Sequence, residues 1–430
     1  MQAFTDLYAF GFFMVPSASF PRTTRLLLAG LCSTLLLACD KTAPTEEPIF
    51  VIEEPDPLPD FCEGYTALPI DRDALARVPP GDVATVKLVD RFEVEHPGGF
   101  SEELCFSVPE NILSLAVTIE GSDRLTYALN GWQGPDGFEI VREGWNSQGQ
   151  GLCDTNCNNR IYARIGAFAA LAPNNPASRV EPGRHILSVE GRYSSSPFAA
   201  PQPRDGNVKV TIHARVVGDE VPETATLDLN LFFSGSDGWT AESAPTDPGF
   251  QQVLEEFGEI YAQVGVEIGE VAYLDVDEEF QDIEDIMSGT GDFAELLSNS
   301  VRAPLDGPSI FFVDRLRSIF DGGGGGVLGI AGGIPGPVHI KGTIASGVAV
   351  MSHQIPGGPP VAHIFAHELG HYMGLFHTSE QNAFGGPQLH DQLPDTPQND
   401  ESYLMHATGG GDILSEWQGI VIRNNPWVKN

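Results

Sequence analysis

The sequence predicts an α/β catalytic domain with a mixed, mostly parallel twisted sheet and an active-site helix, preceded by an all-β, sandwich-like domain. Period-two apolar alternation without long helical patterns dominates residues 61–220, whereas strand and helix patterns alternate in residues 222–430. A chain of 430 residues is long enough for two ordinary domains. A histidine-rich helix near the end of the chain places the candidate site in the second domain.

In the first domain, apolar residues occupy every second position of several short runs. The segments Leu113–Ile119 (LSLAVTI) and Asn207–Val216 (NVKVTIHARV) are typical of strands with one buried face. Clusters of Gly, Pro, Asn and Ser separate such runs, which favours an antiparallel β-sandwich. The domain contains no catalytic constellation, so a carbohydrate- or protein-binding role is only a hypothesis for it.

In the second domain, the apolar period switches between two and 3.6 residues. Alternation in Thr226–Phe233 (TLDLNLFF) predicts a strand, and a helix with Pro248 in its first turn should follow. Further along we expect a strand near Val266–Val276, a helical stretch around Phe293–Leu297, a strand at Ser309–Val313 and, after a glycine-rich loop, an irregular edge strand around Val338–Lys341. Strands that alternate with helices indicate a mostly parallel sheet.

The stretch HELGHYMGLFH is the strongest functional motif. His367 and His371 are four residues apart, so on a helix they lie on one face, one turn apart. Gly374 should end the helix in a left-handed conformation and turn the chain back, which brings His377 to the same ion. A chance match to this pattern, with Glu368 included, is on the order of 1 in 10⁴.

This arrangement indicates metal-assisted hydrolysis of an amide. Three neutral imidazoles leave one position of a tetrahedral zinc open for water, and Glu368 can take the proton of that water. His363 also has ligand spacing to His367, but no glutamate follows it, so we interpret it as a packed residue. The alternative function is a binding protein or adhesin that uses a protease-like scaffold, and a third is hydrolysis of a non-peptide amide. The intact glutamate favours the enzyme.

At these residues the chain resembles the metzincin zinc endopeptidases, and more finely their pappalysin-like (cytophagalysin) members. The similar segments are GLFHT at Gly374–Thr378, DQLPDTP at Asp391–Pro397 and ILSEWQ at Ile413–Gln418, and ESYLMHATGG provides a methionine downstream. The resemblance implies zinc as the cofactor and a protein or peptide as the substrate. It assigns the following roles: zinc ligands His367, His371 and His377, general base Glu368, and Met405 as the residue of the methionine turn.

The resemblance also suggests a second metal, and the chain departs from the family pattern. Some relatives bind calcium after the zinc motif, where Asp391, Asp395 and Thr396 can supply oxygen ligands; a solvated acidic loop is the alternative. Many metzincins carry a tyrosine two residues after the turn methionine, where this chain has Ala407.

Residues 1–39 predict a signal peptide. Two arginines precede the apolar run Leu26–Ala38, which is too short to span a bilayer comfortably. The ending LLAC resembles the lipobox of bacterial lipoproteins, which implies acylation of Cys39 and attachment to the cell envelope; an ordinary secretory signal is the alternative. Residues 40–60 are rich in proline and acid and should form an extended tether.

Four further cysteines, Cys62, Cys105, Cys153 and Cys157, predict two disulfides if the chain is exported. Three pairings are possible. We prefer Cys62 with Cys105 and Cys153 with Cys157, and a CxxxC metal or redox site is the alternative for the second pair.

The net charge of −36 and the pI of about 4.4 argue against nucleic acid as a partner. The glycine-rich segment lacks the Gly-Lys-Ser/Thr ending of a phosphate-binding loop, which argues against nucleotide binding.

Overall fold

The structure is a computed structural model of the chain. It describes residues 62–79, 82–142, 158–195, 201–217, 222–286, 289–317, 327–354, 357–380 and 388–430. Asp60–Asn430 form one compact unit. The expected signal peptide, Cys39, the tether, Cys153, Cys157 and most of the glycine-rich loop lie outside the described residues. No helix in the described ranges is long and apolar enough to cross a membrane.

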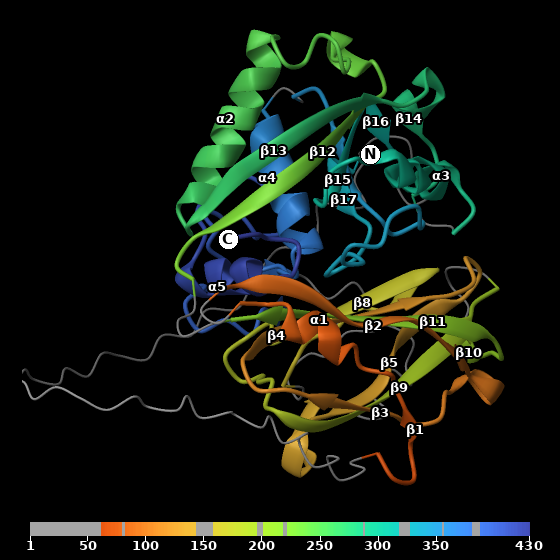
Figure 1. Ribbon diagram of the computed structural model, residues 1–430. Coiled ribbons are helices and arrows are strands. Elements are labelled where there is room, and N and C mark those ends of the chain that lie inside the picture. Colours follow the sequence, from red (N-terminus) through yellow and green to blue (C-terminus); the bar gives the residue numbers. More distant parts are fainter. Residues whose placement is uncertain are drawn as a thin grey trace, which may run out of the picture. The chain divides into compact units, whose positions relative to one another are not determined.

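Two sheets form the first part of this unit (Figure 1). The first sheet has the order β1-β3-β9-β5-β6, with β10 on β9 and β7 on β5. Its strands are β1 (Thr66–Ala67), β3 (Leu104–Val108), β5 (Thr126–Gln133), β6 (Glu139–Val141), β7 (Arg164–Ile165), β9 (Gly183–Tyr193) and β10 (Gln202–Pro203). The second sheet has the order β2-β11-β4-β8, with β2 (Ala84–Glu95), β4 (Ile112–Glu120), β8 (Ala167–Ala172) and β11 (Asn207–Val216).

Pairing in both sheets is antiparallel except between β1 and β3. One apolar core holds residues of both sheets, as a sandwich requires. A short helix, α1 (Arg72–Ala76), precedes β2 and contains no fully buried residue. A disulfide joins Cys62 to Cys105 of β3. This is the pairing that we preferred for these two cysteines.

The second sheet is buried on both faces, which the alternating pattern did not predict. Leu115 and Val117 point into the sandwich core, as expected, but Ala116 between them belongs to the core of the following part of the chain. The polar residues of β11 on that face are buried as well: His213 is 3% exposed and Arg215 is 1% exposed. The alternation therefore separates two buried faces rather than a core face from a solvent face.

The second part contains a five-stranded sheet of order β13-β12-β15-β18-β17. Its strands are β12 (Ala225–Phe233), β13 (Val266–Asp275), β15 (Ser309–Val313), β17 (Gly329–Ala331) and β18 (Val348–Met351). Three of its pairings are parallel, and only the edge strand β17 is antiparallel. The sheet is therefore mixed and mostly parallel.

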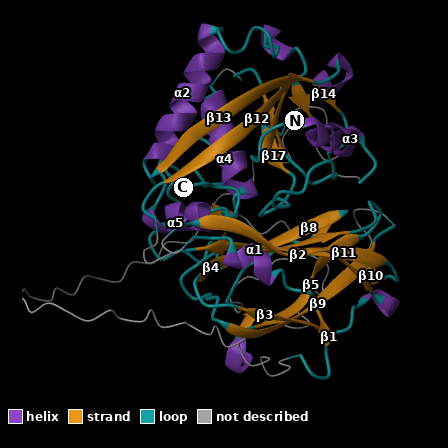
Figure 2. Cartoon of the chain, in the orientation of Figure 1, coloured by secondary structure: helices purple, strands orange, loops and turns teal. Residues whose placement is uncertain are grey.

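Four helices and two small ladders accompany this sheet. The helices are α2 (Pro248–Ala262), α3 (Asp292–Ser298), α4 (Val361–Tyr372) and α5 (Glu416–Asn424). The ladders join β14 (Asp282–Ile283) to β16 (Arg315–Leu316) and β19 (Ser379–Glu380) to β20 (Leu389–His390). Among the residues that the structure describes, strands outnumber helices; Figure 2 colours the two kinds of element.

The alternation of β12 fixes which helices cover which face. Leu231 and Phe233 lie in the core that α2 and α4 share, whereas Phe232 points into a separate core with α3. Phe257 of α2 stacks on Phe365 of α4 with ring centroids 4.1 Å apart. This packing holds α4 against the sheet, and it is α4 that carries the histidine motif.

The prediction of an edge strand at Val338–Lys341 is wrong. These residues form a turn and loop, and the edge of the sheet is β17. His339 has a φ of 51°, which is incompatible with an extended strand, and its ring Nε2 lies 2.9 Å from the Pro426 carbonyl oxygen. Side-chain anchors rather than a strand ladder therefore fix this segment.

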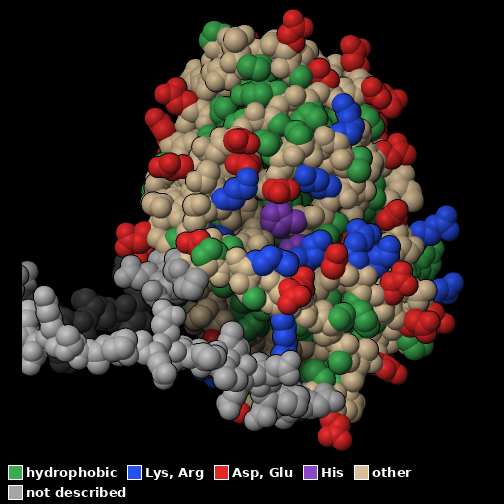
Figure 3. All heavy atoms as spheres, viewed as in Figure 1, with side chains coloured by type: hydrophobic (Ala, Val, Ile, Leu, Met, Phe, Trp, Pro, Cys, Tyr) green, Lys and Arg blue, Asp and Glu red, His purple; other side chains and the backbone are tan. Residues whose placement is uncertain are grey.

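The charge is unevenly distributed over the face shown in Figure 3. Acidic side chains lie mostly around its periphery, and basic side chains gather across its middle beside an exposed histidine. The net charge of −36 therefore does not describe every part of the surface.

Candidate metal centre

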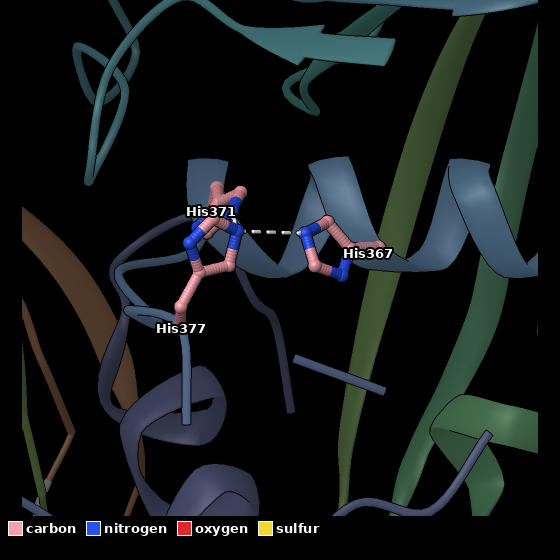
Figure 4. Close-up of side chains that lie close together, drawn as sticks. All are labelled: His367, His371 and His377. Atoms are coloured by element: carbon pink, nitrogen blue, oxygen red, sulfur yellow. Dashed lines mark hydrogen bonds between the residues drawn. The ribbon is translucent and has the colours of Figure 1, made fainter. Parts of the chain in front are cut away.

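Helix α4 presents His367 and His371 on one face (Figure 4). The Nδ1 atom of His367 lies 2.6 Å from the Leu404 carbonyl oxygen, and that of His371 lies 2.7 Å from the Leu375 carbonyl oxygen. A carbonyl only accepts, so each Nδ1 carries the proton and each Nε2 keeps a free lone pair. Both rings are thus fixed in the tautomer that a metal ligand needs.

The helix ends where the sequence predicts. Gly374 has a φ of 108°, its N–H donates to the His371 carbonyl at 2.9 Å, and the Leu375 N–H donates to the Gly370 carbonyl at 2.9 Å. These two bonds define a Schellman motif, which requires a residue in the left-handed region. The reversal carries His377 back towards the helix.

The three histidine side chains converge. The Nε2 atom of His377 lies 3.2 Å from that of His367 and 3.0 Å from that of His371. Two Zn–N bonds of about 2.0–2.1 Å at a tetrahedral angle place two nitrogens about 3.3 Å apart, so the donor set fits such an ion. These residues are the one group of three or more metal-binding side chains within the part of the chain that the structure describes.

Burial keeps the helical histidines neutral. It lowers the pKa of His367 to about 3 and that of His371 well below the ordinary value, and the neighbouring His377 lowers both further. A neutral imidazole is the form that binds a metal.

Glu368 is directed towards the edge strand β17. Burial raises the pKa of its carboxyl group to about 8, although the backbone N–H of Ala331 donates to it and opposes this shift. Gly329 provides the space for this side chain, because a Cβ there would lie 2.4 Å from Glu368 Cγ. A half-buried carboxyl group that is held by a strand is positioned to exchange a proton.

Met405 lies beneath the motif. Its side chain is fully buried, and a Cβ on Gly370 would lie 2.6 Å from its Sδ atom. Its carbonyl accepts from the Thr378 N–H at 2.9 Å. The turn thus supports both the helix and the segment after His377, and its role as a methionine turn stays a prediction.

The proposed calcium ligands do not all converge. Thr396 Oγ1 donates to Asp391 Oδ1 at 2.5 Å, and both residues are buried. Asp395, however, uses both carboxylate oxygens at the start of α5, where it accepts from Ser415 Oγ and the Trp417 N–H, each at 2.9 Å. Calcium binding stays a prediction.

Three other histidines lie away from the cluster, and one of them is His363, which was expected to be a packed residue. His363 Nδ1 lies 3.1 Å from the Gly410 carbonyl oxygen, and His353 Nδ1 lies 3.2 Å from Asp314 Oδ1. His339 contacts the Trp427 ring.

Two charged residues of the site were missed by the sequence analysis. Glu380 Oε2 lies 2.8 Å from His377 Nδ1, and Arg160 donates to Glu380 Oε1 at 2.7 Å. The spacing of three residues between His377 and Glu380 is visible in the sequence, but nothing in the sequence connects Arg160 to a histidine so far along the chain.

Comparison with known proteins adds little to this geometry. No protein-family model matches the chain, and no curated protein matches its sequence. The matching solved structures include the crystal structure of metalloproteinase-II from Bacteroides fragilis, with 12% identity and a TM-score of 0.29 over 50% of this chain. They also include a chaperone–substrate complex, with 12% identity and a TM-score of 0.27 over 50% of this chain.

The chain spans 62% of the Bacteroides chain and 35% of the chain from the chaperone complex. Likenesses at these TM-scores define no shared fold, so the functional argument depends on the residues themselves.

Proposed function

We propose that the protein is a zinc-dependent endopeptidase that cleaves extracellular or envelope proteins. The observation that carries the proposal is the convergence of three histidines: the Nε2 atoms of His367 and His371 lie 3.2 Å and 3.0 Å from that of His377. Glu368 lies on the same helix as the first two. The resemblance to pappalysin-like metzincins, noted from the motif, supports the same class.

The chain's own residues support hydrolysis in the following way. His367, His371 and His377 would hold the zinc, which supplies Lewis acidity and lowers the pKa of a bound water. Glu368 takes a proton from the attacking water and delivers it to the leaving amine, while the Ala331 N–H orients its carboxyl group.

The substitution Glu368→Gln tests this proposal. The amide keeps the shape of the side chain but cannot act as a base, so we expect one zinc per chain and at least a 100-fold lower rate of casein or gelatin cleavage. Zinc content is measured by atomic emission and cleavage by release of fluorescent fragments. Cleavage by this variant at the wild-type rate would refute the role of Glu368, and an adhesin would show no zinc-dependent cleavage with either protein.

We also propose that the chain is exported and anchored through a lipid on Cys39. The Cys62–Cys105 disulfide supports an oxidising compartment. Metabolic labelling with a radioactive fatty acid should label the wild-type chain and not the variant Cys39→Ala. Equal labelling of both proteins would place the lipid elsewhere.

A further inference from the structure

The third histidine of the motif is held differently from the first two. His367 and His371 are oriented by main-chain carbonyls, whereas His377 is oriented by a side chain, because its Nδ1 lies 2.8 Å from Glu380 Oε2. A partner on the far nitrogen of a ligating histidine fixes the ring and the tautomer. The direction of the His377 ring therefore depends on where Glu380 is held.

Glu380 is held by one cation. Arg160 donates to Glu380 Oε1 at 2.7 Å, so each carboxylate oxygen has its own charged or polar partner. The Arg160 side chain is 4% exposed and the Glu380 side chain is 26% exposed. An ion pair at this depth is screened less by solvent than a surface pair.

Arg160 is itself fixed by residues of both parts of the unit. Its guanidinium lies over the Phe376 ring, 4.2 Å from the ring centroid. The backbone N–H of Arg160 donates to Gln392 Oε1 at 3.1 Å, and its backbone carbonyl accepts from Asn174 Nδ2 at 2.6 Å. The arginine is therefore held at its backbone and at its head group, and neither end depends on solvent.

The origin of this arginine in the chain is the informative feature. Arg160 precedes β7 and β8 of the sandwich and lies 220 residues before Glu380. The chain thus places a buried residue of the sandwich two contacts away from a predicted metal ligand.

We propose that Arg160 is a positioning residue of the metal centre and that the sandwich is required for the geometry of this centre: Arg160 fixes Glu380, which fixes His377. The inference depends on the metal site proposed above. It gives the sandwich a role in the site that is independent of any carbohydrate or protein that the sandwich binds.

The test compares Co²⁺ binding by the metal-free full chain and by two variants, Arg160→Ala and Arg160→Lys. Cobalt reports the coordination geometry through its visible absorption, and its affinity is measured by competition with a chelator. We expect Arg160→Ala to weaken Co²⁺ binding 10- to 100-fold and to change the visible spectrum. Arg160→Lys keeps the charge and should restore part of the affinity; if Arg160→Ala does not fold, the lysine variant alone should still bind more weakly than the wild type.

The control is Arg192→Ala. Arg192 pairs with Glu190 inside the sandwich, and its side chain is 12% exposed. This variant should lose stability and keep wild-type cobalt affinity and spectrum.

A double-mutant cycle separates positioning from general stability. If Arg160 acts through Glu380, Arg160→Ala combined with Glu380→Gln should bind cobalt no more weakly than the weaker single variant. Wild-type affinity and spectrum in Arg160→Ala, or additive losses in the double variant, would overturn the inference alone. Failure of the wild-type chain to bind cobalt would overturn the metal site and the inference together.

Discussion

His185 is a buried residue that should make the sandwich sensitive to acid. Its Nδ1 accepts from Trp132 Nε1 at 3.2 Å, and its Nε2 donates to the Glu181 carbonyl at 2.8 Å. A second proton would have to bind Nδ1, which faces the indole N–H. Burial lowers the pKa of His185 to about 4, although the Glu181 carbonyl opposes this shift.

In the unfolded chain the pKa of His185 is about 6.5, so between pH 6.5 and pH 4 the unfolded chain binds a proton that the folded chain does not bind. We expect the free energy of unfolding to fall by about 3 kcal/mol over this range on account of His185. Urea unfolding of the wild type and of His185→Gln, followed from pH 7 to pH 4, measures this contribution as the difference in slope. Parallel pH dependences of the two proteins would refute it.

Some residues of the candidate site can be predicted from the sequence, and others cannot. His367, Glu368, His371, Gly374 and His377 lie within one helix and one turn, so their spacing alone predicts their geometry. The partners of the rings do not follow from spacing. They are main-chain carbonyls and a distant ion pair that only the folded chain brings together.

At the scale of elements, the turn after α4 is a point where a small change should have a large effect. In the variant Gly374→Ala a Cβ would occupy a left-handed conformation and lie 3.2 Å from Leu171 Cδ2. We expect a loss of about 1–2 kcal/mol in the free energy of unfolding and a weaker metal affinity, because the turn positions His377.

The matched control is Gly410→Ala, where an added Cβ meets no atom within 4 Å and the backbone is not left-handed. Thermal unfolding and zinc titration of both variants check the prediction. Similar behaviour of the two variants would show that the conformation of Gly374 is not what fixes the turn.

Most regular elements of the second part follow from the apolar period. The helix that starts at Pro248 and the strand Ser309–Val313 are found where they were expected, because their patterns match their packing. The edge strand was misplaced because a short apolar run such as Val338–Lys341 does not reveal the positive φ of His339 or its bond to Pro426.

At the scale of the whole molecule, hydrogen bonds join the sandwich to the last residues of the second part. Arg215 of β11 donates to the Val428 carbonyl at 2.6 Å and also to the Asn430 side chain. Thr85 Oγ1 donates to the Pro426 carbonyl at 2.7 Å. We therefore expect one cooperative unfolding transition for residues 60–430.

The variant Arg215→Ala removes two hydrogen bonds of a buried cation. We expect it to lower the free energy of unfolding by about 2–3 kcal/mol, measured in guanidinium chloride, whereas Arg72→Ala on the exposed α1 should leave it unchanged. Two separate transitions in the wild type, with Arg215→Ala affecting only one, would show that the two parts unfold independently.

The sequence predicted two successive domains because each part has its own apolar period. It did not predict how closely they join, because alternating residues such as Ala116 and Thr118 read as a solvent face until a neighbouring part covers them. The role of Arg160 was not predicted for the same reason, because its contact with Glu380 joins residues that are distant in the sequence.

The most direct test of the metal centre is a zinc titration of the metal-free chain with peptide cleavage as the readout. We predict that cleavage is absent without metal, rises in proportion to added zinc and reaches its maximum at one ion per chain, because the described residues contain one group of three histidines that could hold the ion. Cleavage by the metal-free chain, or zinc binding at one ion per chain without any cleavage, would contradict this account.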